Sequence, residues 1–319
     1  MLTERLKLYE DRDDVTLTAY ILQDSPELLK GKRRPAVLVC PGGGYMSCSD
    51  REGEPVALKF ASMGYHAFVL RYSTYGEGKA GLPDLSNLVP VKEKSQYPIQ
   101  MLEIGKGMLM IRENAEKWLV DTDRIAVCGF SAGAHNAAMY AANWHTELVS
   151  GHFGEKKENF RPAAAVLGYM LSDYVYKKES ERERDEMNRI FFAASDTAFL
   201  GKAEPDEKQL EEVSPARHVT EQMPPVFLWA TASDELVPVQ HTIRMSYALA
   251  EKHIPFEMHV FEEGPHGLSL ANQASAEAKS QIFPDAAKWA DLAGCWLEKR
   301  FALPLAEKTS FEEMMEHSK

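Results

Sequence analysis

The sequence predicts an α/β fold in which helices cover both faces of a mainly parallel central sheet. Short apolar segments of strand-like composition alternate with longer helical segments along most of the 319 residues, as in a chain of β–α units. Residues 36–40 and 66–70 are almost entirely apolar, as expected for strands that are buried on both faces. Because no repeat or linker-like change of composition divides the chain, we predict one domain over residues 1–319.

The individual elements follow from the spacing of apolar and turn residues. A polar turn joins two alternating segments, 6–9 and 15–21, and predicts an antiparallel hairpin at one edge of the sheet. Further strands are predicted at residues 36–40, 66–70, 124–128, 163–167, 226–230 and 256–260. Helices are predicted at about residues 54–63, 97–119, 132–143, 239–252 and 284–301. The Gly, Pro and Ser residues of 73–95 predict a surface loop. The many charged residues at about 172–222 predict a small inserted cap of short helices.

Composition and charge narrow the classes of partner. The 48 acidic residues outnumber the 36 basic ones, for a formal net charge of −12, which argues against nucleic acids and anionic membranes. No segment approaches the roughly 20 apolar residues of a membrane span, and the charged N-terminus has no signal-peptide core. The cysteines at 40, 48, 128 and 295 form no Cys-x-x-Cys pair, which favours free thiols in a reducing compartment over disulfides. We therefore expect a cytoplasmic protein, and the sequence leaves homo-oligomer formation open.

Residues 129–133 read Gly-Phe-Ser-Ala-Gly and match the Gly-x-Ser-x-Gly pattern of a nucleophile elbow. A β-prone segment precedes this pattern and an Ala-rich helical segment follows it, which is the strand–turn–helix context that the pattern requires. At such a turn Ser131 Oγ points away from the backbone, and small neighbours let other segments approach. The N–H of Ala132 lies at a helix N-terminus, where it can donate to an oxyanion. We therefore take Ser131 as the candidate nucleophile.

A serine hydroxyl needs a base within hydrogen-bond reach, and that base needs an acid to orient it. Asp234 follows the predicted strand 226–230 after a short turn, and His266 lies in a loop flanked by Gly and Pro after the strand 256–260. Both residues lie in loops that follow strands C-terminal to Ser131, and this position predicts that Asp234 is the acid and His266 the base. Helix capping is the alternative role for Asp234, and Glu235 is the alternative acid.

Gly42, Gly43 and Gly44 follow the buried strand 36–40 and offer backbone N–H groups for an oxyanion hole. A phosphate-binding loop would continue with Gly-Lys-Ser or Gly-Lys-Thr, and a dinucleotide-binding loop would read Gly-x-Gly-x-x-Gly before a helix. The chain continues with Tyr-Met-Ser instead, so both alternatives are weak. No His-Glu-x-x-His motif, cysteine cluster or calcium-loop spacing indicates a metal. We therefore expect neither a metal nor an organic cofactor.

Four motifs stand in the order that one superfamily uses: Pro-Gly-Gly-Gly-Tyr at 41–45, Gly-Phe-Ser-Ala-Gly at 129–133, Ser-Asp-Glu-Leu-Val-Pro at 233–238 and Gly-Pro-His-Gly at 264–267. With them the chain resembles the α/β-hydrolases over about residues 33–301. More narrowly it resembles the bacterial acetyl esterase and acetylxylan esterase-like branch, related to the hormone-sensitive-lipase esterases. Pro41 stands where many lipase-branch relatives have histidine, as in the acetylxylan esterase-like members. The resemblance implies an α/β-hydrolase fold, a Ser131–His266–Asp234 triad, and oxyanion donors at Gly43, Gly44 and Ala132.

The resemblance also implies a serine esterase that hydrolyses short-chain acyl esters, acetyl esters above all. Its substrates would be small-molecule esters or acetylated oligosaccharides such as xylo-oligosaccharides. Tyr45, Tyr72 and Tyr75 follow predicted strand ends, where they would either contact a sugar or pack in the core. An exopeptidase or amidase of the prolyl-oligopeptidase type is an alternative, although such enzymes usually carry a further N-terminal domain. A non-catalytic binding protein on a hydrolase scaffold is another, although all three triad residues are present.

Overall fold

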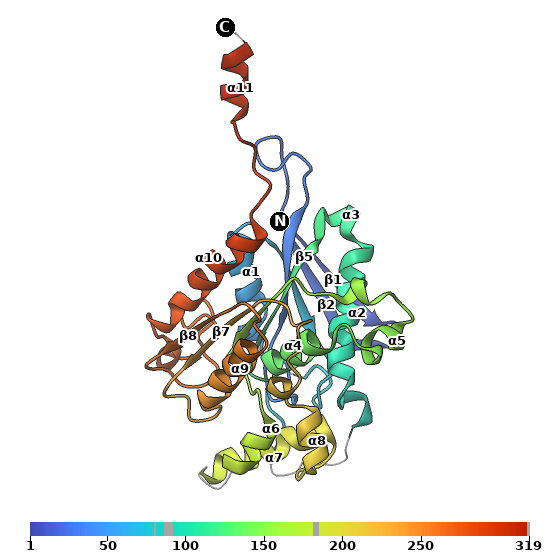
Figure 1. Ribbon diagram of the computed structural model, residues 1–319, viewed down its shortest axis with the longest axis vertical. Coiled ribbons are helices and arrows are strands. Elements are labelled where there is room, and N and C mark those ends of the chain that lie inside the picture. The colour runs from blue at the N-terminus through green and yellow to red at the C-terminus, as the bar shows by residue number, and fades with distance from the viewer. Residues whose placement is uncertain (80, 86–91, 181–184, 318–319) are drawn as a thin grey trace.

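A single sheet organises the computed structural model, which describes residues 1–79, 81–85, 92–180 and 185–317. Within these ranges the sheet has eight strands in the order β1-β2-β4-β3-β5-β6-β7-β8. The pairs β1–β2 and β2–β4 are antiparallel, and every later neighbour is parallel (Figure 1). The strands are β1 (Leu2–Tyr9), β2 (Arg12–Ile21), β3 (Arg34–Cys40), β4 (His66–Arg71), β5 (Val120–Phe130), β6 (Ala164–Gly168), β7 (Val226–Thr231) and β8 (Phe256–Phe261).

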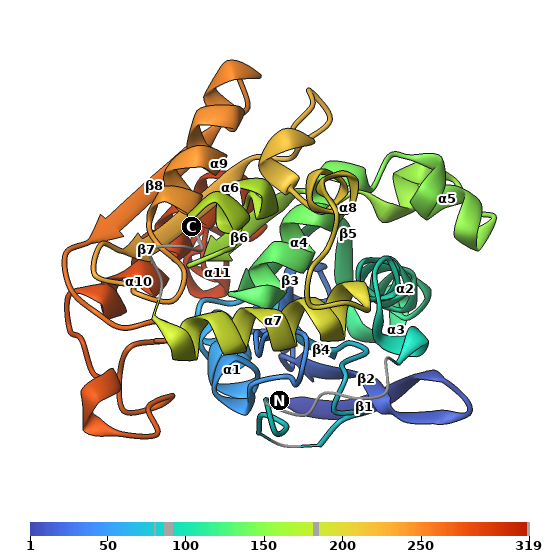
Figure 2. The ribbon, with the colours of Figure 1, turned by 90° about the horizontal axis from the view of Figure 1, so that it is seen from below.

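Helices cover both faces of this sheet (Figure 2). The larger core joins α2, α4 and α9 to side chains such as Leu38 and Val127, and the second core joins α1 and α10 to side chains such as Val39 and Cys128. Neighbouring residues of β3 thus enter different cores, because successive strand side chains point to opposite faces. This architecture confirms the predicted α/β class. The helices are α1 (Glu54–Ser62), α2 (Ile99–Glu113), α3 (Ala115–Trp118), α4 (Ala132–Asn143), α5 (Glu147–Phe153), α6 (Tyr174–Glu179), α7 (Glu186–Leu200), α8 (Glu207–Glu212), α9 (Gln240–Glu251), α10 (Trp289–Phe301) and α11 (Ser310–His317).

The main departure from the predicted elements is the helix expected over 97–119, which is divided into α2 and α3. Asn114 stands between the two helices with φ −96° and ψ 7°, and both its side-chain amide and its backbone N–H donate to the carbonyl of Met110, at 2.9 and 3.2 Å. Leu119 then takes a left-handed conformation with φ 55°, which ends α3 and precedes β5. The apolar pattern of the sequence does not indicate this local change of backbone angles.

The segment expected as a cap, 172–222, holds α6, α7 and α8, and its residues 181–184 lie outside the described ranges. These helices gather beyond the end of the sheet at which β3 and β5 finish (Figure 1). A buried ion pair between Lys177 of α6 and Asp196 of α7 joins the two helices. Most of the loop expected at 73–95 is irregular as well, apart from a short 3₁₀ turn at Glu93–Ser95, with residues 80 and 86–91 outside the description.

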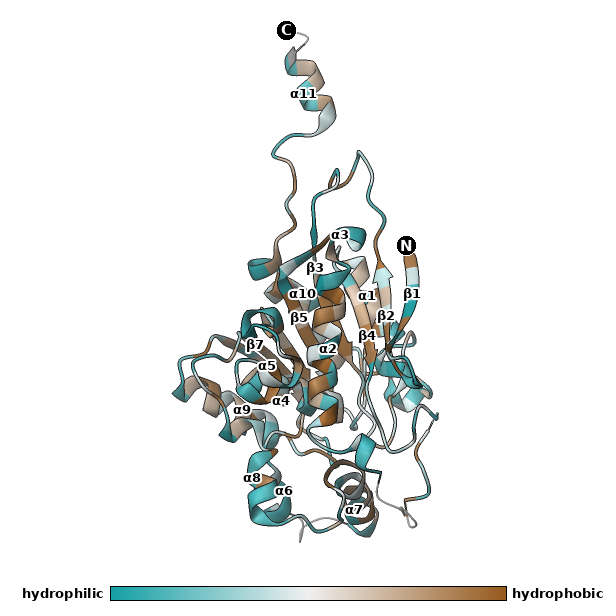
Figure 3. Cartoon of the chain, turned by 90° about the vertical axis from the view of Figure 1, so that its right-hand side faces the viewer, coloured by the Kyte–Doolittle hydropathy of each residue, from teal (hydrophilic) through white to brown (hydrophobic). Residues whose placement is uncertain are grey.

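The distribution of apolar residues agrees with the layered arrangement. Hydrophobic residues concentrate on the strands and on the neighbouring helix α2, whereas the short helices α6 and α8 are largely hydrophilic (Figure 3). All four cysteines are free, and Cys40 and Cys128 are buried in the paired strands β3 and β5, as the sequence predicts. Among the described residues, none of the helices combines the length and the hydrophobicity needed to cross a membrane.

Candidate active site

The serine of the Gly-x-Ser-x-Gly motif occupies a strained turn. β5 ends at Phe130 and α4 begins at Ala132, so Ser131 alone joins the strand to the helix. Its backbone has φ 50° and ψ −121°, a region that non-glycine residues rarely adopt and that often marks a functional site. The N–H of Ser131 donates to the carbonyl of Gly168 at 3.0 Å, which anchors the turn to the end of β6. The strained backbone is thus held by neighbouring structure.

The two motif glycines allow close approach of backbone segments. A Cβ on Gly133 would overlap the carbonyl oxygens of Cys40 and Pro41, and a Cβ on Gly129 would overlap the carbonyl of Gly133. The elbow therefore packs directly on the start of the glycine loop at residues 41–44. This contact brings Ser131 beside Gly43 and Gly44, which the sequence predicts as oxyanion donors.

Gly133→Ala is expected to destabilise the fold by about 3 kcal/mol or more, because backbone atoms cannot move aside as a flexible side chain can. Chemical denaturation of the purified variant measures this change. Gly107→Ala is the matched control, since a Cβ at this buried helical position would meet only side chains at 3.6 Å or more. The control should keep or slightly raise stability. Equal stability of both variants would contradict the packing of the elbow on the glycine loop.

The structure brings the three predicted triad residues together. His266 Nε2 lies 2.7 Å from Ser131 Oγ, and His266 Nδ1 lies 2.7 Å from Asp234 Oδ2. The Asp234 side chain is fully buried, and 13% of the His266 side chain is exposed. In this arrangement the imidazole can accept the serine proton while the carboxylate fixes its tautomer.

Asp234 does not cap α9, the alternative role that the sequence leaves for it, because that helix begins at Gln240 and its N-cap position is Val239. The Oδ1 atom of Asp234 accepts the N–H groups of Leu236 and Val237 at 3.0 and 2.9 Å. These bonds fix the carboxylate, so that its other oxygen faces His266. Glu235, the alternative acid, is exposed and does not replace Asp234 at the imidazole.

The charge around His266 favours its protonated form. Burial disfavours the charged imidazole, but the charge of Asp234, its hydrogen bond and the charge of Glu52 outweigh burial and raise the pKa of His266. A general base must be neutral, so its activity falls as the pH drops through this raised pKa. For folding the sign is opposite: the ion pair contributes stability below the unfolded-state pKa, and this contribution is lost as the pH rises through the folded-state pKa.

A cleft of about 620 Å³ opens at the paired Ser131 and His266. Gly43 and Gly44 line it, with φ values of 131° and 60°, a region in which glycine is favoured. Ala132 directly follows the serine as the first residue of α4 and is 8% exposed. The predicted oxyanion residues therefore surround the nucleophile, and their donor role is a proposal.

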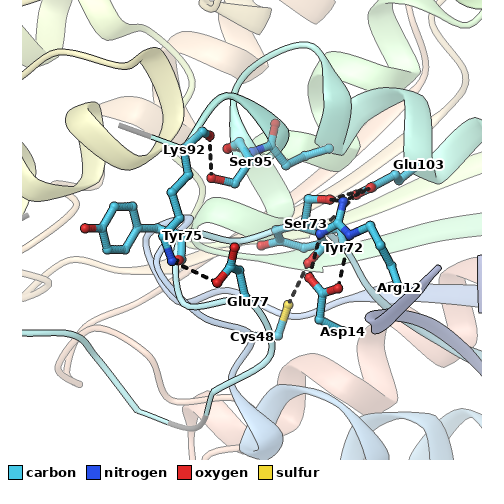
Figure 4. Close-up of polar contacts among 11 residues, drawn as sticks. Arg12, Asp14, Cys48, Tyr72, Ser73, Tyr75, Glu77, Lys92, Ser95 and Glu103 are labelled. Atoms are coloured by element: carbon cyan, nitrogen blue, oxygen red, sulfur yellow. Dashed lines mark hydrogen bonds and ion pairs between the residues drawn. The ribbon is translucent and has the colours of Figure 1, made fainter. Parts of the chain in front are cut away.

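The three tyrosines expected as sugar contacts lie elsewhere, and the structure corrects this expectation. None of them lines the cleft described above. Tyr45 is 1% exposed, its hydroxyl bonds to His135 Nδ1, and its ring stacks on that of Phe199 at 4.0 Å. Tyr72 donates to the carbonyl of Pro41 at 2.6 Å. Tyr75 packs under the ammonium group of Lys92, which lies 4.8 Å from its ring centre (Figure 4).

The physical reason is side-chain direction. Tyr45 has the left-handed backbone angle φ 60°, and its ring lies in the core. Position after a strand does not determine which way a loop side chain points. The three tyrosines therefore stabilise the loops behind the site, which is the packing role that the sequence leaves open.

Two residues near the site are absent from the sequence prediction. Phe191 of α7 lines the cleft, and its ring lies 3.0 Å from where a Cβ on Gly44 would stand. Glu52 is 3% exposed beside the glycine loop. The apolar pair Phe191–Phe192 stands in a charged segment and could have indicated a buried helix face. Glu52 stands among other charged residues, so nothing in the sequence indicates that it is buried. Among the residues that the structure describes, no group of three or more His, Cys, Asp and Glu side chains could hold a metal ion.

The sequence of this chain resembles a known protein family and several characterised enzymes. The sequence profile of the BD-FAE family matches residues 90–249, just over half of the chain. The chain belongs to the BD-FAE family. Among the relatives of this BD-FAE protein, endo-1,4-beta-xylanase B of Butyrivibrio fibrisolvens is 33% identical over 248 residues, which cover 75% of this chain and 33% of the xylanase. Acetylxylan esterase of Xylanibacter ruminicola is 23% identical over 258 residues, or 80% of this chain and 45% of that protein.

Solved structures match the BD-FAE protein over nearly its whole length. MGS-M1, an alpha/beta hydrolase enzyme from a Medee basin deep-sea metagenome library, is 32% identical with a TM-score of 0.68, covering 95% of this chain and 99% of that one. The carboxylesterase Cest-2923 from Lactobacillus plantarum is 26% identical with a TM-score of 0.76, covering 96% and 100%. The chain has the α/β-hydrolase fold. It spans only a third to about a half of the length of the curated relatives it matches.

Proposed function

We propose that this protein is a carboxylic ester hydrolase that uses Ser131, His266 and Asp234 as its catalytic triad. The observation that carries the proposal is the continuous line of contacts from Asp234 Oδ2 through the imidazole to Ser131 Oγ, each 2.7 Å long. A non-catalytic binding protein would not need a strained, partly exposed serine aligned with a paired base. The esterase names among the relatives support the same reaction class.

The proposed reaction has two halves. Ser131 Oγ attacks the ester carbonyl while His266 takes its proton, and Asp234 stabilises the resulting imidazolium. The N–H groups of Ala132 and of Gly43 or Gly44 hold the oxyanion of the tetrahedral intermediate. His266 then gives its proton to the leaving alcohol, and a water molecule hydrolyses the acyl-enzyme by the same route.

We propose short acyl groups, acetyl above all, as the acid part of the substrate, and a sugar or other small polar alcohol as its other part. Phe191 next to Gly44 restricts the space beside the proposed oxyanion hole. Other parts of the cleft wall are polar and suit hydroxyl groups: Ser49, Asp50, Arg51 and Glu277. The names of the xylanase and acetylxylan esterase relatives support acetylated xylo-oligosaccharides within this class.

Phe191→Ala is expected to improve the use of longer acyl chains, because removal of the ring enlarges the cleft beside Gly44. The ratio of kcat/KM for p-nitrophenyl octanoate to that for the acetate should rise by about 10-fold, the size expected when a pocket gains room for several methylene groups. Initial rates on both esters measure this ratio.

The control for this change is Met187→Ala on the same helix, because Met187 is 68% exposed and does not line the cleft. This variant should keep the wild-type ratio. An unchanged ratio in Phe191→Ala would remove Phe191 from the acyl side of the substrate.

A substrate panel tests the reaction class itself. It contains p-nitrophenyl acetate, butyrate and octanoate, acetylated xylo-oligosaccharides, and aminoacyl-nitroanilides. The proposal expects hydrolysis of the acetate and release of acetate from the oligosaccharides. Activity confined to the anilides would replace the esterase with the amidase or exopeptidase alternative, and inactivity on every member would contradict both.

A further inference from the structure

A buried carboxylate outside the triad connects two of the loops that form the site. Glu52 ends the 3₁₀ turn Asp50–Glu52 and is 3% exposed. Its Oε2 accepts the N–H of Gly42 at 2.7 Å, and its Oε1 accepts the hydroxyl of Tyr169 at 2.6 Å. Because both partners are donors, both carboxylate oxygens act as acceptors, and the proposed mechanism uses neither of them.

The contact with Gly42 controls where the glycine loop lies. A Cβ at Gly42 would stand 2.6 Å from the carbonyl of Phe130, 2.8 Å from Glu52 Oε2 and 3.0 Å from Ser131 Cβ. The backbone at Gly42 is thus held between the nucleophile elbow on one side and the carboxylate on the other. A shift of Glu52 would therefore move the loop that carries Gly43 and Gly44.

The contact with Tyr169 connects Glu52 to the loop of residues 262–269, which carries His266 and is called the histidine loop here. Tyr169 follows β6, and its hydroxyl oxygen accepts the N–H of Ser269 at 2.9 Å, three residues after His266. The edge of its ring packs against the imidazole, with ring centres 5.0 Å apart. Burial, together with the charge and hydrogen bond of Glu52, raises the pKa of the Tyr169 hydroxyl. The hydroxyl therefore stays protonated and donates its hydrogen bond to Glu52.

We propose that Glu52 is a positioning residue that holds the glycine loop and, through Tyr169, the histidine loop in register with Ser131. The inference rests on the proposed function, since it assigns a role to Glu52 in the same reaction. Loss of its second contact alone would loosen the base, and loss of both would also displace the proposed oxyanion donors.

The titratable groups that face the imidazole come from several elements. Asp234 contacts Nδ1, Ser131 contacts Nε2, Tyr169 packs on the ring, and Glu52 adds its charge from the 3₁₀ turn. Glu52 acts in the same direction as Asp234 and favours the protonated imidazole. Removal of the Glu52 charge should therefore lower the pKa of His266, and the shift reports that the carboxylate lies near the imidazole.

The test variant is Glu52→Gln, which keeps the size of the side chain. Its amide oxygen can still accept the Gly42 N–H, but its NH₂ then meets Tyr169, whose hydroxyl loses its acceptor. Glu103→Gln is the matched control. Glu103 is likewise a fully buried carboxylate that accepts a backbone N–H, from Ser73 at 2.6 Å, and a serine hydroxyl. It does not line the cleft and lies beside Arg12 (Figure 4).

Three measurements compare wild type, Glu52→Gln and Glu103→Gln. They are the rate at which diethyl p-nitrophenyl phosphate modifies Ser131 with release of p-nitrophenolate, the pKa of His266 by histidine NMR, and the melting temperature. The phosphate ester reports on serine, base and oxyanion donors whatever the natural substrate is. We expect Glu52→Gln to react about 10- to 100-fold more slowly and to have a lower His266 pKa. Glu103→Gln should change only the melting temperature.

The outcomes separate this inference from the proposed function. If Glu52→Gln reacts with the phosphate ester at the wild-type rate, Glu52 is a packing residue and the inference fails. If wild type itself is not modified by the phosphate ester, the proposed function fails. In that case an unchanged His266 pKa in Glu52→Gln would still overturn the placement of the Glu52 charge near the imidazole.

Discussion

Ser131→Ala is expected to lower kcat for p-nitrophenyl acetate by about 10³-fold or more while the protein stays folded. The substitution removes only Oγ, and alanine can take the φ of 50° at this position at the same backbone cost as serine. The pair of His266 and Asp234 and the proposed oxyanion donors remain in place. Binding should therefore change little, and the loss should appear in kcat because the attacking atom is gone.

Steady-state kinetics and a melting curve on the same preparation measure both halves of this expectation. Ser246→Ala is the control, because Ser246 is a buried serine of α9 whose hydroxyl bonds to the carbonyl of Ile243 in its own helix. This control should keep full turnover. Undiminished kcat in folded Ser131→Ala would remove the serine from the reaction and with it the proposed mechanism.

The nucleophile turn could be predicted because its requirements are local. A strand, a serine between small residues and a helix stand in consecutive positions, and the structure reproduces this order at β5, Ser131 and α4. Asp234 and His266 could be placed because the ends of parallel strands meet at one edge of a sheet. Strands β7 and β8 are neighbours, so the loops that follow them lie side by side.

What the sequence could not predict depends on side-chain direction and on contacts between distant segments. Tyr45 and Glu52 both follow β3, and their residue types suggest a sugar contact and a solvated charge. The structure turns the tyrosine into the core and buries the carboxylate between Gly42 and Tyr169. Residues 52 and 169 are far apart in the chain, and no periodic pattern reports that they meet.

Asp234→Asn is expected to lower kcat by about 10⁴-fold, the size of effect that the same change of the acid has in a known serine protease. The direction follows from the bonds around Asp234. Its Oδ1 accepts two backbone N–H groups, so the amide oxygen of asparagine keeps that place and its NH₂ faces His266. A donor at this position forces Nδ1 to accept. The proton then moves to Nε2, which can no longer take the proton of Ser131.

A higher pH would not restore this variant, because the fault lies in the tautomer rather than in the charge of the imidazole. The pH profile of kcat/KM therefore separates it from wild type, whose activity should fall at low pH as His266 becomes protonated. Glu235→Gln is the matched control, since it changes the neighbouring acid, which is exposed, and should cost no more than a few-fold. If Glu235→Gln lost more activity than Asp234→Asn, Glu235 would be the acid. The hydrogen bond that His266 Nδ1 donates to Asp234 would then be only a structural link between the two loops.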